Sequence, residues 1–543
     1  KIRPITNEKL VELTRQIENL PNDNLETEEL KSTLYERLKS DADFLKNKTI
    51  CDMYTAAFFA PKLHLNQVPT SQDVFDVMNG VDETKPGIRD FAQNLAEENK
   101  FFHWPIEFPK VFANGGFDCV LGNPPWDVSQ LKEEEFFATI LPEISVLPVD
   151  ERGAAIEKLK ISQPEIYASF VKQKRLMESL NSFYGGSGNY PLTTGGKFNL
   201  YAVFSELMLK LKRKDGCAGF VVPTGIATDD GTKFFFGHIT SNRMLTSLYD
   251  FENKEGLFQI HKQYRFSLVT LAGCNGNPEF AFFLHRISDL DVLDRRITLS
   301  PESLKLVNPN TSTAPLYRSK KDVELTERIY NNCGSLINRS GNVEQNPWRI
   351  AFREGLFNIS ADKKKKMFKQ SPGYGDDGKA LLPLYEGKMM YQMDHRFATF
   401  VPAKKFSEVL LQEKGSADYS VNPQYWSLYT ETVLRATKMD SAVVKSYREY
   451  LKKTDNQFLE KLLTNCRKSK NEKLNRIAIL QTDLKESILQ VAEELCPKYL
   501  FAYRIITNTT NERTLIASVL PFCGVSHSMY VMYVGQTPVK QAC

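Results

Sequence analysis

The stretch Phe117-Asp118-Cys119-Val120-Leu121-Gly122-Asn123-Pro124-Pro125-Trp126 decides the fold prediction for this chain. Its first six residues form a short, mostly apolar run between Gly115-Gly116 and the two prolines. A run of that length between turn residues predicts a buried strand that ends in a loop. The tetrapeptide Asn123-Pro124-Pro125-Trp126 then lies at the carboxyl end of the strand, which is where open α/β sheets bind their ligands.

The tetrapeptide offers the groups that a nucleobase needs when it has left its duplex. Two prolines restrict the loop, and Trp126 provides an aromatic face that replaces lost base stacking, worth about 1–3 kcal/mol. The side-chain oxygen of Asn123 and the backbone carbonyl of Pro124 could accept both hydrogens of an exocyclic amine. Accepting them would draw the nitrogen toward tetrahedral geometry and free its lone pair to attack an electrophilic methyl group. The alternative is a Pro-Pro turn with Trp126 packed in a core.

Strands and helices alternate on the carboxyl side of the tetrapeptide. Residues 217–223, 245–251 and 266–274 are predicted as further strands, and residues 198–211 have the spacing of an amphipathic helix. This alternation predicts an α/β fold with a mainly parallel sheet.

The length of 543 residues favours two or three domains. We expect a mainly helical N-terminal segment with an insertion over residues 1–100, the α/β domain over 101–300, and a differently built domain over 301–543. In the last of these, residues 441–480 form a long helical stretch with ten basic and four acidic side chains, and residues 499–536 have the pattern of β-strands joined by turns.

The composition limits the class of protein. Hydrophobic residues make up 42% and charged residues 25% of the chain, which is ordinary for soluble globular proteins. No run approaches about 18 consecutive apolar residues and the sequence begins without an apolar signal, so we expect no membrane span and a cytoplasmic location. The net charge of +4 is too small to indicate a nucleic-acid partner by itself. Nine scattered cysteines and seven histidines show no ligand spacing, so we expect reduced thiols and no metal.

Several separated motifs resemble the Eco57I-type adenine-N6 DNA methyltransferases, a family of bacterial restriction-modification and phage-defence proteins. The motifs occur in the family's order and extend over most of the chain from about residue 50 onward. They are Phe102–Phe112, Gly115–Asp118, Asn123–Trp126, Gly196–Tyr201, Val221–Thr228, Tyr385–Lys388 with Gln392 and Asp394–Phe397, and Asn511–Ala517.

The resemblance implies a fold and a reaction. The fold is α/β: a partial Rossmann-like class I methyltransferase sheet, forming the C-terminal part of the catalytic domain, followed by a mixed α+β target-recognition domain. The reaction is methyl transfer from S-adenosylmethionine to a flipped adenine in double-stranded DNA. Asn123, Pro124, Pro125 and Trp126 would form the catalytic motif. A second aromatic that stacks on the base would fall at Phe234 or Phe235, although either ring could equally be packed beside a helix.

The cofactor loop of the family is not evident in this sequence. Such a loop is a glycine-rich turn between a strand and a helix, and in this family it precedes the Asn-Pro-Pro-Trp motif. The first 114 residues contain only Gly80 and Gly87. The cluster Gly185, Gly186 and Gly188 follows a helix-like segment, so a flexible loop is the preferred interpretation. We therefore expect the cofactor loop in an upstream part of a longer parent chain, together with an upstream nuclease or helical region, in which case this chain alone is inactive.

The resemblance also implies DNA contacts in the second half of the chain. Basic and amide side chains can neutralise phosphates and read base edges, and each of them could instead be a solvated surface group. The DNA-binding candidates are Lys363, Lys364, Lys388, Gln392, Arg396 and Arg513.

Two other classes of function remain open. Asp377, Glu386 and Lys388 imitate a metal-dependent nuclease site, in which carboxylates bind the metal and a lysine steadies the attacking water. Magnesium-dependent DNA cleavage that Glu386→Ala abolishes would identify that activity. A binding-only DNA recognition module would bind its site unchanged after Asn123→Ala and would never yield methylated product.

Overall fold

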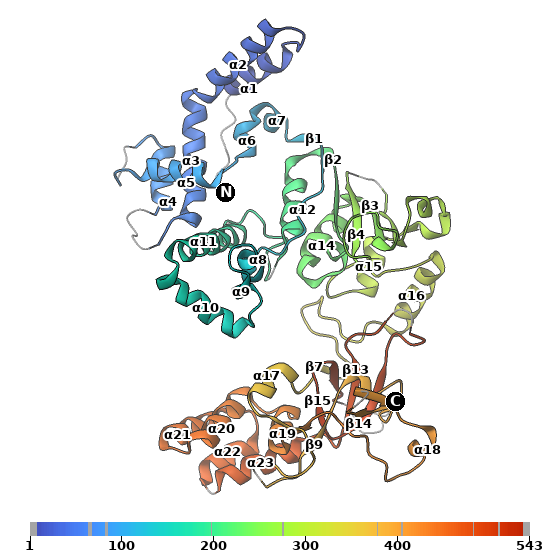
Figure 1. Cartoon of the computed structure of the whole chain (residues 1–543). Coiled ribbons are helices and arrows are strands. Elements are labelled where there is room, and N and C mark those ends of the chain that lie inside the picture. The colour runs from blue at the N-terminus through green and yellow to red at the C-terminus, as the bar shows by residue number, and fades with distance from the viewer. Residues whose placement is uncertain are drawn as a thin grey trace. The chain divides into compact units, whose positions relative to one another are not determined.

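The computed structural model of the chain (Figure 1) divides into two compact units, Lys1–Val343 and Glu344–Cys543. It has a mixed α/β fold with several sheets. Among the residues that the structure describes, none of the helices is both long and apolar enough to cross a membrane. The described residues are 8–62, 68–81, 85–196, 198–273, 276–376, 378–402, 405–481, 483–508 and 511–535.

The first unit begins with helices that pack on one another. The central one, α3, contacts α4 and α5 through Met53, Ala56, Val74 and Ala92, and it also contacts α11. Helix α4 begins at a capping box, in which Thr70 and Asp73 satisfy each other's backbone N–H groups. The α-helices up to residue 211 are α1 (Glu8–Asn19), α2 (Leu25–Lys39), α3 (Ala42–Phe59), α4 (Ser71–Met78), α5 (Ile88–Asn99), α6 (Trp104–Glu107), α7 (Pro109–Ala113), α8 (Glu133–Ala138), α9 (Pro142–Ser145), α10 (Val149–Ser162), α11 (Pro164–Gly186) and α12 (Leu200–Leu211).

A six-stranded sheet forms the centre of this unit, in the order β1-β2-β4-β3-β5-β6. The strands are β1 (Phe117–Gly122), β2 (Lys212–Pro223), β3 (Leu245–Glu252), β4 (Arg265–Leu271), β5 (Glu279–Leu284) and β6 (Ile297–Thr298). β1 is parallel to β2 and β3 is parallel to β5, whereas β4 is antiparallel to both β2 and β3, and β6 is antiparallel to β5. The predicted strands are confirmed, but the prediction of mainly parallel pairing is wrong, because β4 lies between β2 and β3.

The directions of the strands still place the tetrapeptide at the edge of the sheet where the strands end, as predicted. Since β4 is antiparallel to both of its neighbours, β1, β2, β3 and β5 all point the same way. Their carboxyl ends therefore share one edge of the sheet, and the tetrapeptide after β1 lies there.

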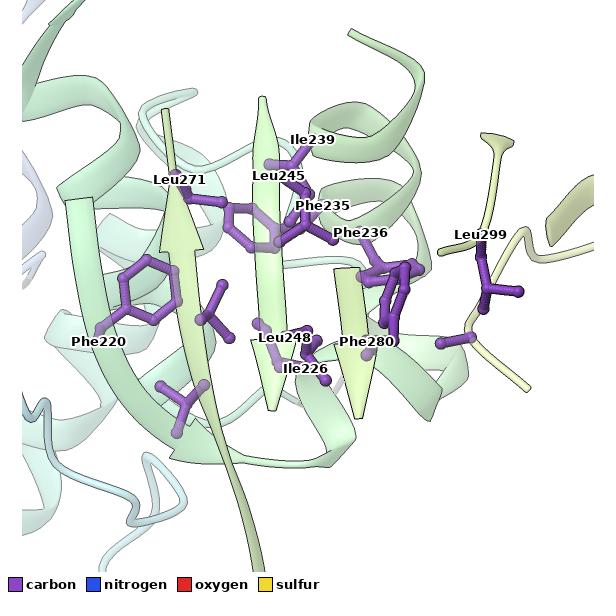
Figure 2. Packing of buried hydrophobic residues seen from close by; sticks show 14 of the residues in the cluster. Phe220, Ile226, Phe235, Phe236, Ile239, Leu245, Leu248, Leu271, Phe280 and Leu299 are labelled. Carbon is purple, nitrogen blue, oxygen red and sulfur yellow. The ribbon is translucent and has the colours of Figure 1, made fainter. Parts of the chain in front are cut away.

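The hydrophobic core lies between the sheet and the helices on one of its faces. Figure 2 shows Phe235 and Phe236 directed from α14 (Lys233–Ser241) toward the strands, where Leu248 and Phe280 lie in the same cluster. Both phenylalanines are fully buried, and burying one such side chain contributes about 1.5–3 kcal/mol. The short helix α13 (Gly225–Thr228) adds Ile226 to this core.

Strand β1 is an edge strand, and in this respect the prediction of a buried strand is wrong. Its only pairing partner among the described residues is β2. Asp118, Cys119 and Leu121 are exposed, with Leu121 exposed to 83%. Strands of parallel sheets are normally covered on both faces, so an exposed leucine here leaves apolar surface in water beside the tetrapeptide.

Residues 301–343 belong to the first unit, although the prediction placed them in the second domain. Two helices, α15 (Pro301–Val307) and α16 (Lys320–Cys333), follow β6. Leu304, Tyr317 and Val323 lie in the same core as the sheet. Their apolar side chains fix the boundary between units at residues 343 and 344 rather than at 300 and 301.

The second unit combines small sheets with a helical bundle. Two four-stranded sheets have the orders β15-β9-β12-β8 and β14-β13-β16-β7, and β10 pairs with β11. Residues 441–480 are helical as predicted but form three helices, and the first of them ends at Thr454 in a left-handed conformation. The helices are α17 (Ile359–Lys364), α18 (Leu411–Lys414), α19 (Tyr429–Ala436), α20 (Ser441–Lys453), α21 (Asn456–Lys468), α22 (Glu472–Leu480) and α23 (Leu484–Leu495). The strands are β7 (Ala351–Glu354), β8 (Phe368–Lys369), β9 (Leu382–Tyr385), β10 (Ala398–Val401), β11 (Lys405–Glu408), β12 (Trp426–Ser427), β13 (Tyr499–Arg504), β14 (Ala517–Pro521), β15 (Gly524–Val525) and β16 (Met529–Tyr533).

The glycine pair before β1 offers a matched test of this fold. Gly116 has φ 125°, and a Cβ there would lie 2.5 Å from the carbonyl oxygen of Leu211, whereas a Cβ on Gly115 (φ 90°) would meet nothing nearer than 4.0 Å. Both sites disfavour L-residues, so the difference between them isolates the clash with β2. We expect Gly116→Ala to lower the free energy of unfolding by about 1–3 kcal/mol more than Gly115→Ala in urea titrations. Equal losses would contradict the close approach of the backbones.

Candidate functional site

A cavity of about 330 Å³ opens at the carboxyl end of β1. It is lined by the tetrapeptide Asn123-Pro124-Pro125-Trp126 together with Phe258 and Ile260. Asn123 and Pro125 are exposed, Pro124 is buried and Trp126 is half-buried. No hydrogen bond to the Asn123 side chain or the Pro124 carbonyl is found among the described residues. The cavity therefore presents free polar acceptors beside an aromatic wall.

The indole of Trp126 is fixed from two directions. Its Nε1 donates a hydrogen bond of 3.2 Å to the carbonyl oxygen of Val221 in β2. Its ring lies nearly parallel to those of Tyr264 and Phe266, with centroid distances of 6.2 Å to each, and meets the edge of Phe258 at 6.1 Å. Trp126 is thus partly packed in a core, as the alternative prediction held, and it also lines the cavity.

The loop between β3 and β4 supplies the other lining residues, and Asn253 organises that loop. Asn253 is fully buried. Its Nδ2 donates to the carbonyls of Phe258 (2.9 Å) and Ile260 (3.1 Å), and its Oδ1 accepts from the backbone N–H of Phe258 (2.9 Å). The backbone N–H of Asn253 also donates to the carbonyl of Tyr264 at 2.9 Å. One side-chain amide therefore holds both wall residues.

Two of the sequence motifs, Gly196–Tyr201 and Val221–Thr228, converge on the same edge of the sheet. The backbone N–H of Leu200 donates to the carbonyl of Asp127 at 3.0 Å. The hydroxyl of Tyr201 lies where a Cβ on Gly225 would be 2.8 Å away, so the start of α12 approaches the turn after β2. Burial raises the pKa of the Tyr201 hydroxyl. Lys197 of the first motif lies outside the described residues.

The two predicted stacking phenylalanines lie in different environments. Phe235 is 0% exposed and packs in the core of the sheet (Figure 2). Phe234 is 60% exposed on α14, with the Lys233 ammonium 5.3 Å from its ring centroid. A base could therefore reach Phe234 but not Phe235, and neither lines the cavity at Trp126.

The glycine cluster considered for a cofactor does not form a loop between a strand and a helix. Gly185 and Gly186 are the last residues of α11, and Gly188 follows with φ 70°. A Cβ on Gly186 would lie 3.3 Å from the Phe58 ring. Since no strand precedes these glycines, their geometry does not fit the cofactor turn described above.

The predicted DNA-binding residues divide into two groups. Lys363, Lys364, Lys388 and Arg513 are exposed on the second unit. The Lys363 and Lys388 ammonium groups lie 5.5 Å from the ring centroids of Tyr425 and Phe406 respectively. Exposed cations of this kind can reach a phosphate.

Gln392 and Arg396 form the other group, and their side chains make hydrogen bonds to backbone atoms of the second unit. The Gln392 side-chain oxygen accepts from the backbone N–H of Ala517 at 3.0 Å. Arg396 Nη1 donates to the carbonyl oxygens of Ser416 (2.8 Å) and Tyr419 (3.4 Å). These contacts give both side chains a role in folding the unit.

The residues of the nuclease hypothesis are only partly described. Asp377 lies outside the described residues. Glu386 is half-buried, and burial raises the pKa of its carboxyl group above the ordinary value. Among the described residues, no group of three or more His, Cys, Asp and Glu side chains could hold a metal ion.

The sequence prediction missed the second wall of the cavity. Phe258, Ile260 and Tyr264 lie in an aromatic-rich segment between two predicted strands. That segment was a possible signal, because exposed aromatic residues in a loop are common in binding sites. Only the placement of β3 and β4 shows that the segment reaches Trp126.

Part of the chain matches the model of a known protein family. Residues 29–178 and 169–258 match the family model described as Eco57I restriction-modification methylase. The resemblance is thereby confirmed over residues 29–258, which include the tetrapeptide and Phe258. The match supports a DNA methyltransferase role. No curated protein matches the sequence.

Solved structures with some similarity are also restriction-modification enzymes. The type IIL enzyme MmeI in complex with DNA is 8% identical, with 78% of this chain and 41% of that chain covered and a TM-score of 0.28. The type IIG restriction endonuclease BpuSI is 12% identical, with 95% and 58% covered and a TM-score of 0.24. The ATP-dependent type ISP enzyme LlaBIII bound to DNA is 9% identical, with 84% and 26% covered and a TM-score of 0.22. This chain thus covers less than two thirds of the length of each.

Substitution of Asn253 tests whether one amide organises the cavity wall. Asn253→Ala removes three hydrogen bonds and leaves buried backbone groups unpaired, so we expect a loss of stability on the order of 2 kcal/mol. Hydrogen exchange of the amides in residues 256–263 should accelerate. Asn242→Ala is the control, because that side chain bonds only at the exposed end of α14. Unchanged exchange in Asn253→Ala would contradict the proposed role.

Proposed function

We propose that this chain is a segment of a site-specific DNA adenine-N6 methyltransferase of a bacterial restriction-modification or phage-defence system. It acts on double-stranded DNA in the cytoplasm, and the reaction moves a methyl group from S-adenosylmethionine to a flipped adenine. The cavity between the tetrapeptide and Phe258 carries this proposal. Its volume of about 330 Å³ falls in the range of about 300–1,000 Å³ that is usual for small-ligand sites.

The acceptors at the cavity suit an exocyclic amine. The oxygen of the Asn123 side chain and the carbonyl of Pro124 have no hydrogen-bond partner among the described residues, so both are available to the two hydrogens of adenine N6. Accepting both hydrogens would orient the nitrogen lone pair out of the plane of the base. Pro124 and Pro125 restrict the loop that holds these oxygens, which reduces the reorganisation needed on binding.

The aromatic walls suit the faces of the base. The Trp126 ring is held by Val221 and Phe266, so it can stack on a base without losing much freedom of its own. We propose that Phe258, whose ring is steeply inclined to that of Trp126, contacts the edge of the base, because it lines the cavity. Phe234 remains a proposal for a more distant contact with the DNA, since its ring is exposed.

The methyl donor requires a glycine-rich turn of its own, and Gly185, Gly186 and Gly188 do not form one between a strand and a helix. We propose that the sheet is the incomplete Rossmann-like sheet of a class I methyltransferase, and that the cofactor turn is carried by a segment outside residues 1–543. The unpaired edge of β1 supports this proposal, because a strand added there would bring its carboxyl end beside Asn123. Exposed Leu121 would then be covered.

We further propose that the second unit recognises the DNA target. Exposed Lys363, Lys364, Lys388 and Arg513 would neutralise phosphates. Gln392 and Arg396 would hold the fold of that unit through the backbone contacts that they make.

Replacement of Asn123 tests the reaction in the cells that carry the protein. Asn123→Ala removes an acceptor of an amine hydrogen, so we expect the N6-methyladenine at the protein's target sites to fall by a factor of about 100 or more. The measurement is mass spectrometry of genomic nucleosides with sequencing that detects modified bases. Asn123 is exposed, so protein levels should not change.

Asn332→Ala is the matched control for that experiment, because Asn332 is an exposed asparagine on α16. It should leave methylation unchanged. Methylation that persists in Asn123→Ala would contradict the proposed reaction, and loss of N4-methylcytosine instead of N6-methyladenine would change the substrate.

Calorimetric titration of S-adenosylmethionine into this chain tests the location of the cofactor site. We expect no one-to-one binding, because Gly185, Gly186 and Gly188 do not form a turn between a strand and a helix. One-to-one binding by the folded chain would contradict that placement and would make residues 183–188 the candidate site.

A further inference from the structure

A buried carboxylate joins three strand ends at the edge of the sheet that carries the cavity. Asp250, near the end of β3, is 0% exposed. Its oxygens accept hydrogen bonds from the hydroxyl of Thr224 after β2, from the guanidinium of Arg265 in β4 and, at 3.1 Å, from the backbone N–H of Phe283 in β5. A buried charge is tolerated only when it is paired in this way. The three elements are therefore fixed relative to one another.

Phe283 has an unusual backbone conformation at this junction. Its φ is 57°, in the left-handed region, where the register between β3 and β5 shifts. For an L-residue this conformation costs about 1–2 kcal/mol. The half-buried ring lies between two guanidinium groups, with the Arg265 carbon 4.6 Å and the Arg318 carbon 4.5 Å from its centroid. The strained turn thus places one aromatic ring between two arginines.

Only one of these two arginines is neutralised. Arg265 pairs with Asp250. Arg318 is exposed, and no ion pair of its guanidinium is found within the described ranges; its backbone N–H donates to Asp322, but that bond does not involve the charge. A guanidinium that stacks on a ring keeps its planar N–H edge free, and that edge matches the oxygens of a phosphate.

The stacked pair is connected to the cavity by direct contacts. Tyr264 lies nearly parallel to Trp126 at 6.2 Å, and the next residue, Arg265, contacts Phe283. Further cations lie at the same edge of the sheet: Lys262 precedes β4, and Lys254 and Arg286, after β3 and β5, pair with Glu252 and Glu255. A DNA strand whose base occupies the cavity must carry its phosphates past this edge.

We propose that Arg318, whose guanidinium lies over the Phe283 ring, binds a backbone phosphate of the DNA strand whose adenine enters the cavity at Trp126. This inference rests on the proposed function. Asp250 and Phe283 position the arginine, and the contact would set the path of the strand without reading its sequence.

The test is fluorescence anisotropy of a labelled, mixed-sequence duplex with the full chain, from about 50 to about 200 mM salt. We expect Arg318→Ala to weaken binding several-fold and to reduce the slope of log K against log salt by about 0.9, which corresponds to one lost phosphate contact. The DNA affinity of Arg318→Lys should lie between those of Arg318→Ala and the wild-type chain, because lysine keeps the charge and loses the planar fork.

Arg328→Ala is the matched control, since Arg328 is an exposed arginine on α16 whose side chain makes no ring contact or ion pair with the part of the chain that the structure describes. It should leave the slope unchanged. Equal slopes for Arg318→Ala and the wild-type chain, or an equal loss in Arg328→Ala, would overturn the inference and leave the proposed function standing. If the wild-type chain binds no duplex, both the inference about Arg318 and the proposed function are contradicted.

A further arm separates DNA from free phosphate as the source of the ligand. Replacing chloride by inorganic phosphate at constant ionic strength should leave duplex binding unchanged, because a single phosphate gains none of the neighbouring contacts. Release of the duplex by inorganic phosphate, absent in Arg318→Ala, would overturn the assignment to DNA.

Discussion

The hydrogen bond from the Trp126 indole to the Val221 carbonyl ties the loop after β1 to β2, and the geometry of the site depends on it. An edge strand that is exposed on one side gives little support to the loop that follows it. The indole compensates, because it packs on Phe266 as well as bonding to β2. Asn123 and Pro124 are thereby held in a short loop that contains two prolines and ends at a fixed ring. The same indole that anchors the loop also forms a wall of the cavity, so stability and binding depend on one side chain.

Two buried polar side chains hold this edge of the sheet in place. Asn253 holds the loop that carries Phe258 and Ile260, and Asp250 holds the starts and ends of the strands beside it. Both are fully buried polar side chains whose bonding groups are taken up by backbone or by charged partners. Removing either would leave unpaired polar groups in the interior, which costs more than the bonds themselves contribute. Rigid support of this kind suits a site that must receive a base in one orientation.

The sequence predicted the parts of the site that are local. The apolar run from Phe117, the turn that ends it and the acceptors of Asn123 and Pro124 could all be identified without knowledge of tertiary structure. Phe258 could not, because it reaches Trp126 only through the antiparallel insertion of β4 between β2 and β3. The choice between Phe234 and Phe235 depended on how α14 turns toward the sheet, which the apolar spacing of a short helix does not fix. The exposure of Leu121 also escaped prediction, because burial of a strand depends on neighbours that are distant in sequence.

The central claim is that the cavity beside Trp126 receives adenine, and saturation-transfer NMR with free nucleosides tests it without a cofactor or a recognition sequence. We predict that deoxyadenosine receives magnetisation from the chain, that deoxycytidine receives clearly less, and that Asn123→Ala weakens the deoxyadenosine signal while the exposed position of Asn123 leaves the fold intact. Equal signals from both nucleosides, or a deoxyadenosine signal unchanged by Asn123→Ala, would contradict the account.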